Sequence, residues 1–221
     1  GLAAALEAGR SGKRVIIVDE QNEFGGTLLA STQTVDGIDA ATWAEQATSQ
    51  LEGMDNVLVM PRTTAFGYYD HNFVVALERR TDHIGPVAKT GTRQRLHRIR
   101  AHQVILATGA IERPLVFGNN DLPGIMLANS VSTYINRYAV VPGQRCIIMT
   151  TNDSGYQTAL DIQAAGRTVV AVVDSRHTPD GRLVAAAKAA GIQVMVGHGV
   201  IEAQGGKKVT GAIVAPLDEA G

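Results

Sequence analysis

Apolar and polar residues alternate along the chain in blocks that are typical of an α/β protein. In the first half, helices are predicted over Ala3–Gly9 and Thr42–Leu51, and a strand over Arg14–Val18 lies between them. This largely apolar run, bounded by turn residues, indicates a buried strand of a parallel sheet. Four further short strands are predicted at 57–60, 63–69, 73–79 and 103–106. We expect the first three of these four to form a small antiparallel insertion.

The second half of the chain repeats the alternation of strand and helix. Its predicted elements are helices over 130–137, 155–165 and 181–190, strands over 145–149, 168–173 and 192–196, and an antiparallel pair over 200–203 and 209–215. This order is that of a βαβαβ unit. Prolines, glycines and asparagines over 111–127 mark a boundary between the halves. We therefore predict an α/β fold with tandem dinucleotide-binding (Rossmann-type) domains, 1–115 and 116–221, and a small antiparallel insertion.

Composition and charge narrow the function. The chain has 221 residues, 45% of them hydrophobic, which is enough for a sizeable core. Its net charge of -1 creates no overall field that would attract nucleic acid or an anionic membrane, and no apolar run is long enough to span a bilayer. The single cysteine, Cys146, excludes an internal disulfide, a CxxC redox pair and a cysteine cluster for zinc. These features favour a cytoplasmic, metal-free protein that binds neither nucleic acid nor membrane.

The first group of candidate residues resembles part of a dinucleotide-binding motif. Gly1 begins a helix, Asp19 and Glu20 end the next strand, and the turn that contains Gly26 and Thr27 follows. In a dinucleotide fold the glycine lets a helix N-terminus approach the pyrophosphate, and the acid accepts hydrogen bonds from the adenosine ribose. Asp19 is favoured as the ribose ligand because it follows the strand directly. A carboxylate there also disfavours a 2'-phosphate, so NAD is expected rather than its phosphorylated form.

Purely structural roles for these residues are also possible. A carboxylate at a strand end is often only a solvated cap, and Thr27 could serve the glycine turn alone. Gly1 supplies only the last glycine of a G-x-G-x-x-G motif, and the chain starts without a methionine. We therefore expect a fragment whose preceding residues contain a strand and two more glycines.

Two further stretches bear on nucleotide binding. The predicted strand at 103–106 runs into small residues that include Thr108 and Gly109, which allow backbone to pass close to a dinucleotide. In the second half, the position of a phosphate-binding loop is taken by 150–155, where only Gly155 is glycine and Asp153 would repel phosphate. The second domain is therefore expected to hold no nucleotide, and Asp174, which ends its second strand, is expected to be structural.

Several stretches together resemble the alpha subunit of heterotetrameric sarcosine oxidase. They are Val18–Gly26, Thr63–Asn72, Ala107–Phe117 and Asn119–Asp121. The resemblance spans the whole chain and is specific, because the run from Phe66 to Asn72 is not a general flavoprotein feature. It implies an internal segment of a longer subunit, whose complete form includes a C-terminal folate-binding region.

The resemblance implies a function within a complex. This family oxidatively demethylates sarcosine to glycine with oxygen, giving hydrogen peroxide and, with tetrahydrofolate, methylenetetrahydrofolate. FAD in the beta subunit oxidises the amine, electrons pass to FMN at the alpha–beta interface, and the alpha subunit binds NAD in a glutathione-reductase-like domain. Gamma and delta subunits complete the assembly. By this resemblance Asp19, Glu20, Gln21 and Thr27 match NAD contacts, and Ala65 matches a backbone contact to adenine.

Other interpretations compete with this one. The cluster Tyr68–His71 has no nucleophile spaced to use it, so a turn or subunit-contact role is favoured and no catalytic residue is assigned. The arginines of 93–100 alternate with other residues as one face of an exposed strand would. Two other functions remain open: an FAD-dependent NAD(P)H oxidoreductase of the pyridine nucleotide-disulphide oxidoreductase superfamily, and a non-catalytic scaffold subunit. In every case the segment alone is expected to be inactive.

Overall fold

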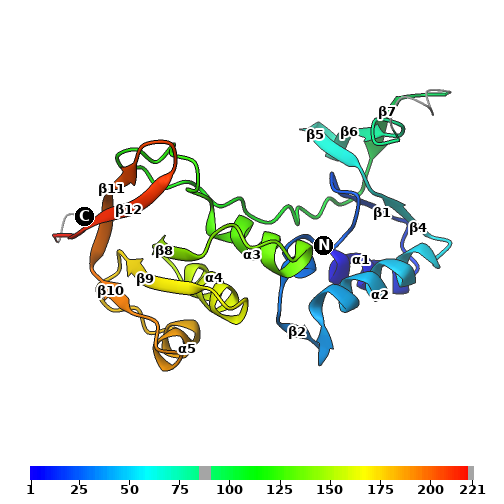
Figure 1. Ribbon diagram of the computed structural model, residues 1–221. Coiled ribbons are helices and arrows are strands. Elements are labelled where there is room, and N and C mark those ends of the chain that lie inside the picture. Colours follow the sequence, from blue (N-terminus) through cyan, green and yellow to red (C-terminus); the bar gives the residue numbers. More distant parts are fainter. Residues whose placement is uncertain (85–90, 219–221) are drawn as a thin grey trace. The chain divides into compact units, whose positions relative to one another are not determined.

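The computed structural model describes residues 1–84 and 91–218 and divides into two compact units. Unit 1 comprises Gly1–Ala110, drawn from blue to green in Figure 1, and unit 2 comprises Ile111–Gly221, drawn from green to red. The division falls a few residues before the predicted boundary after residue 115. Each unit has its own buried apolar cluster, as expected of separate domains.

Unit 1 is built on a parallel strand pair covered by helices. Its first elements are α1 (Leu2–Arg10), β1 (Val15–Val18), the 3-10 helix η1 (Gly26–Ala30), the short hairpin β2 (Thr34–Val35) and β3 (Ile38–Asp39), α2 (Ala40–Glu52) and β4 (Val57–Met60). β1 and β4 pair in parallel, with Val15 opposite Val57, and α2 forms the crossover between them. Asp39 is the N-cap of α2, and its carboxylate accepts a hydrogen bond from the Thr42 backbone N–H at 3.0 Å.

The core of unit 1 lies between the helices and the strand pair. Leu2 and Leu6 of α1 and Leu51 of α2 are buried there together with Phe24, and Ala44 lets the helix backbone approach closely. α1 packs beside α2. The carboxyl end of β1 lies next to the turn between β4 and the following strand, to which Asp19 is hydrogen-bonded.

The antiparallel insertion exists, but its strands differ from the predicted ones. It consists of β5 (Thr63–Tyr69), β6 (Phe73–Arg79) and β7 (Gln94–Arg100), with the 3-10 turn η2 (Asp70–Asn72) between the first two. The prediction that placed 57–60 in this sheet was wrong, because that apolar run is β4 and pairs with β1. β7 replaces it, which confirms an exposed strand at these arginines. The prediction that the arginines share one face was wrong, because Arg95 and Arg98 are three positions apart and point to opposite faces of the strand.

The strand predicted at 103–106 was also wrong. Residues 101–110 form no strand, and Ile105 and Leu106 are 68% and 72% exposed. A strand requires a hydrogen-bonded neighbour, and no strand in the described part of the chain pairs with this segment. The apolar run is present, but the partner that would make it a strand is not among these residues.

Unit 2 matches the predicted βαβαβ order. Its elements are α3 (Ala128–Tyr138), β8 (Arg145–Thr150), α4 (Ser154–Ala164), β9 (Thr168–Asp174), α5 (Arg182–Ala189), β10 (Val194–Val196), β11 (His198–Gly205) and β12 (Val209–Pro216). The parallel sheet has the order β10-β9-β8, and β11 and β12 form an antiparallel hairpin. Tyr156, Val172 and Val184 form the centre of the core, one from each of α4, β9 and α5.

Candidate functional site

The segment that follows β1 is fixed by backbone hydrogen bonds to the turn after β4. The Asp19 N–H donates to the Met60 carbonyl at 3.1 Å, and the Asp19 carbonyl accepts from the Thr63 N–H at 2.8 Å. The Gln21 carbonyl accepts from the Arg62 N–H at 2.7 Å. These hydrogen bonds fix the main chain of Asp19–Gln21 between the parallel strand pair and the start of β5.

The Asp19 carboxylate has acceptor capacity left over. The side chain is half-buried, and its Oδ1 accepts one hydrogen bond, from the Gln21 N–H at 2.9 Å. No other partner of this carboxylate occurs among the described residues. A carboxylate has about four lone-pair sites, so Asp19 can accept hydrogen bonds from a pair of ligand hydroxyls without breaking an internal one.

A cavity of about 300 Å³ opens beside this segment. Its lining residues are Glu20, Gln21, Asn22, Arg62, Arg79, Asp82 and His83. The exposed Glu20 is held through its main chain, because the Arg79 guanidinium donates to the Glu20 carbonyl at 2.8 Å. The predicted residues Glu20 and Gln21 thus line one cavity together with cations that the sequence pattern did not single out.

The glycine turn at the start of η1 requires glycine at its first position and favours it at the second. A Cβ at Gly25 would lie 2.9 Å from the Ala44 Cβ, and the residue has φ 136°, so both packing and backbone geometry require glycine. Gly26 has φ 56°, a backbone conformation that favours glycine, although a Cβ there would meet nothing within 4 Å. Thr27 is exposed in the first turn of η1. Among the described residues, Thr27 forms no hydrogen bond with Asp19–Gln21.

The remaining predicted residues fall into two places. Gly1 is the N-cap of α1, and a Cβ there would lie 3.7 Å from the Ala107 Cβ, which places the helix start beside the stretch that contains Thr108 and Gly109. Both of these residues are exposed, and Gly109 has φ 70°. Ala65 is exposed on β5, two residues after the Thr63 that bonds to Asp19. Gly1 therefore lies with the 107–109 stretch, while Ala65 lies near the Asp19 segment.

Unit 2 has a carboxylate in the corresponding place, at the end of β9, but its contacts are all internal. Asp174 is completely buried, and its Oδ2 accepts from the Tyr156 hydroxyl at 2.7 Å and from the Arg176 Nη2 at 2.8 Å. The Arg176 backbone N–H donates to Oδ1 at 2.9 Å. Burial alone would raise the pKa of the Asp174 carboxyl, but the bonds from Arg176 and Tyr156 outweigh burial and lower it.

The loop that would bind phosphate in unit 2 is occupied by its own side chains. Arg176 forms a second ion pair, with Asp153 at 2.9 Å, and the Asn152 Oδ1 accepts from the Ser154 N–H at 2.9 Å. Gly155 is required here, because a Cβ would lie 2.6 Å from the Thr150 Cβ. The loop therefore packs α4 closely on β8, and an aspartate stands where phosphate would bind.

The described residues contain neither a cluster of potential metal ligands nor a helix that could span a membrane. Within 1–84 and 91–218, no group of three or more His, Cys, Asp or Glu side chains is arranged to hold a metal ion. In the same ranges no helix combines the length and the apolar character needed to cross a membrane.

Tyr68 and His71 lie at the tip of the β5–β6 hairpin, where the Tyr68 hydroxyl donates to the Asn72 Oδ1 at 2.7 Å and so stabilises the turn.

Comparison with known proteins confirms the resemblance stated from the sequence. No family model matches the chain. It is 46% identical over 223 residues to sarcosine oxidase subunit alpha of Corynebacterium sp. (strain P-1) and 53% identical over 176 residues to that of Rhizobium meliloti (strain 1021). These alignments cover 99% and 80% of the chain. The chain spans only 23% and 18% of the length of these two relatives.

Solved structures confirm the fold class. The chain resembles L-proline dehydrogenase from P. horikoshii with a TM-score of 0.64 and 21% identity, over 96% of this chain and 36% of that one. It resembles thioredoxin reductase from Lactococcus lactis with a TM-score of 0.67 and 14% identity, over 99% and 68% of the two chains. At these identities the likeness concerns the fold alone.

Proposed function

We propose, from the likeness to sarcosine oxidase alpha subunits, that this chain is the segment of such a subunit that binds NAD at the carboxyl end of β1. The complete enzyme demethylates sarcosine oxidatively to glycine, with hydrogen peroxide as a product and methylenetetrahydrofolate when tetrahydrofolate is present. FAD in the beta subunit and FMN at the alpha–beta interface carry out the redox steps, and the gamma and delta subunits complete the assembly. No residue of this chain acts on the amine.

The observation that carries the proposal is the partly unsatisfied carboxylate of Asp19. In dinucleotide-binding folds an acid at the end of the second strand accepts hydrogen bonds from the ribose hydroxyls. Asp19 follows a parallel strand, keeps free acceptor positions after bonding the Gln21 N–H, and is followed directly by Glu20 and Gln21, which line an open cavity. These properties fit the hydroxyl donors of a ribose.

The residues of the chain divide the work of binding. Asp19 accepts the ribose hydroxyls, Glu20 and Gln21 border the adenosine, and the backbone at Ala65 contacts the adenine. Gly1, at the N-terminus of α1, faces the pyrophosphate together with the small residues Thr108 and Gly109, because a helix N-terminus without a Cβ lets phosphate approach the backbone N–H groups. When bound, NAD supplies a nicotinamide ring capable of hydride transfer.

The closed site in unit 2 argues against the reductase alternative. An FAD-dependent NAD(P)H oxidoreductase of this architecture uses both nucleotide domains, with flavin in one and nicotinamide in the other. Here the Asp174 carboxylate is buried and bonded to Tyr156 and Arg176, so it has no position for a ribose hydroxyl. A single nucleotide in unit 1 is therefore the better proposal.

The experiment starts with the intact alpha subunit. Denaturation and mass analysis of the released small molecules should give NAD, and FAD released from this subunit would refute the assignment. In a second step Asp19→Ala is compared with Asp55→Asn, which alters an exposed carboxylate of the same unit. Loss of a hydrogen bond to a charged acceptor costs about 1.5–3 kcal/mol, so the Kd of NAD should rise about 10- to 150-fold for Asp19→Ala. It should stay unchanged for Asp55→Asn.

A further inference from the structure

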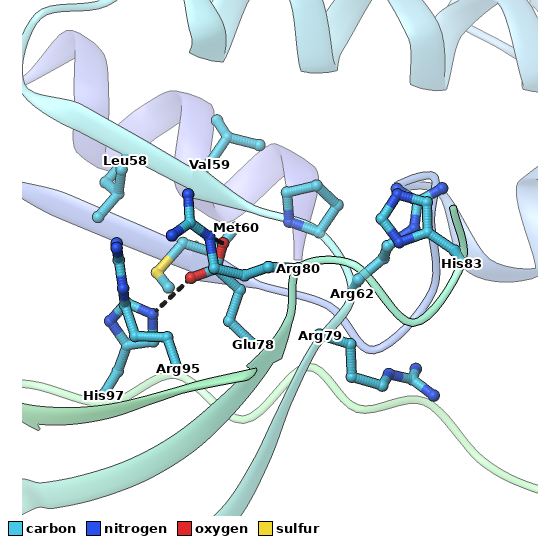
Figure 2. A pocket seen from close by; sticks show the side chains of 11 residues that line it. Leu58, Val59, Met60, Arg62, Glu78, Arg79, Arg80, His83, Arg95 and His97 are labelled. Atoms are coloured by element: carbon cyan, nitrogen blue, oxygen red, sulfur yellow. Dashed lines mark hydrogen bonds and ion pairs between the residues drawn. The ribbon is translucent and has the colours of Figure 1, made fainter. Parts of the chain in front are cut away.

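A second, larger cavity in unit 1 lies between β4 and the strands β6 and β7 of the insertion. Its volume is about 430 Å³. We call it the basic cavity. Its lining residues are Leu58, Val59, Met60, Pro61, Arg62, Glu78, Arg79, Arg80, His83, Arg95 and His97. Figure 2 shows Arg80, Arg95 and His97 gathered near Leu58 and Met60. Arg62 and His83 lie toward the other end of the same cavity.

The basic cavity contains one carboxylate, and its own neighbours already neutralise it. Glu78 Oε2 is 2.9 Å from the His97 Nε2, and Glu78 Oε1 is 3.6 Å from the Arg80 Nε. Arg95 stands directly opposite Glu78 in the β6–β7 register, yet no ion pair joins them. Glu78 therefore contacts Arg80 and His97, and it forms no ion pair with Arg62 or Arg95.

Two arginines at this cavity have no acceptor for their side chains. Arg79 donates to the Glu20 carbonyl, whereas the guanidinium groups of Arg62 and Arg95 form no hydrogen bond or ion pair with the described residues. Arg62 is held in place by its backbone, with its N–H bonded to the Gln21 carbonyl. A guanidinium offers five N–H donors in a planar fork that matches oxyanions. These donors are thus positioned and unused.

The positive charge at this place is local. The chain as a whole has 20 Lys and Arg against 21 Asp and Glu, so its net charge of -1 offers no general attraction for anions. Four arginines and one glutamate line a single cavity, together with the apolar residues Leu58, Val59, Met60 and Pro61. A cavity focuses the field of such charges and raises the local concentration of anions. Its volume is that of small-molecule sites rather than of a flat polyanion-binding face.

We propose that the basic cavity binds a small, multiply charged oxyanion, with Arg95 and Arg80 holding one end of the ligand and Arg62 the other. The apolar side chains of Leu58 and Met60 lie under the ligand. The two cavities share Arg62, Arg79 and His83, whereas Arg80 and Arg95 line the basic cavity and not the cavity next to Glu20 and Gln21, so these two arginines separate the proposed anion site from the proposed NAD site.

The test uses the intact alpha subunit and two probes, tripolyphosphate and citrate, measured by isothermal titration calorimetry. At least one probe should bind saturably at about millimolar concentration, and its affinity should fall with ionic strength. Binding of tripolyphosphate alone identifies a phosphate-type ligand, and binding of citrate identifies a polycarboxylate. Absence of binding by both probes, or binding only of an acidic polypeptide such as poly-glutamate, overturns the proposal.

A pair of variants on the same strand tests the location. Arg95→Gln removes a cavity cation, while Arg98→Gln removes an exposed arginine of β7 that does not line the cavity. Residues 95 and 98 point to opposite faces because successive side chains alternate along a strand. Arg95→Gln should weaken binding of the probe about tenfold, equal to about 1.4 kcal/mol, and leave the NAD content unchanged. An equal loss in Arg98→Gln would place the anion elsewhere.

Discussion

Replacement of Asp174 by asparagine tests whether the second nucleotide position has become part of the core. In the folded protein its carboxylate is completely buried and accepts hydrogen bonds from Tyr156 and from both the backbone and the guanidinium of Arg176. Asp174→Asn removes the negative charge and replaces one carboxylate oxygen by an amide N–H₂ group. This group cannot accept a hydrogen bond from the donors that face it. The variant therefore leaves a cation and a hydroxyl with one partner fewer.

The expected cost follows from the exposure of the partner. Breaking a buried ion pair by removal of one member costs about 3–5 kcal/mol. The Arg176 side chain is 35% exposed and keeps its second ion pair, with Asp153, so the lower end of that range applies. We expect Asp174→Asn to lower the free energy of unfolding by about 3 kcal/mol. Asp153→Asn is the matched control, because its side chain is 38% exposed and its pair is worth at most about 1 kcal/mol.

Urea denaturation of both variants at several pH values measures these differences. Because the pKa of Asp174 is lower in the folded state than in the unfolded chain, its contribution is complete above the unfolded pKa and is lost as the pH falls through the folded pKa. The gap between wild type and Asp174→Asn should therefore be constant near neutral pH and close below roughly pH 4. A cost no larger than that of Asp153→Asn, or a gap that persists in acid, would refute the reasoning.

Two further predictions concern unit 2. Gly155→Ala should lower the free energy of unfolding by about 1–3 kcal/mol, because its Cβ would lie 2.6 Å from the Thr150 Cβ; Gly206→Ala, with nothing within 4 Å, should change it by less than about 0.5 kcal/mol in the same urea titration. Burial raises the pKa of the Cys146 thiol to about 11. Iodoacetamide at pH 8 should therefore modify the folded protein at least about 100-fold more slowly than the urea-unfolded chain, as followed by intact mass, and equal rates would contradict this burial.

Local patterns predicted most of the elements, and the exceptions depend on partners distant in the sequence. The apolar runs of β1, β8 and β9 were recognised because a strand of a buried parallel sheet needs no alternation. The run that became β4 has the same character, but the choice between β1 and the insertion as its neighbour is made by tertiary packing. The stretch 103–106 shows the reverse case, in which the pattern is that of a strand and no described neighbour completes it.

The candidate site shows the same limit. Spacing after an apolar strand was enough to single out Asp19, Glu20 and Gln21. The sequence pattern does not single out Arg62 and Arg79, because they lie in different elements, at the turn after β4 and at the end of β6. The fold brings them together, with a hydrogen bond of 2.9 Å between the Arg79 N–H and the Arg62 carbonyl. A charge cluster assembled from separate strands has no signature in a linear sequence.

The two aspartates that follow or end a parallel strand, one in each unit, show how closely related turns acquire different roles. In both, Oδ1 accepts a hydrogen bond at 2.9 Å from the backbone N–H two residues later, which belongs to Gln21 in unit 1 and to Arg176 in unit 2. The local backbone is therefore not what separates them. The difference lies in the side chain two residues after the aspartate. The Arg176 side chain folds back onto Asp174 and neutralises its charge, whereas the Gln21 side chain makes no such contact with Asp19. An acidic residue at a strand end therefore predicts ribose binding only when the residue two positions later is also considered. A cation at that position can pair with the carboxylate and occupy the acceptor positions that ribose hydroxyls would need.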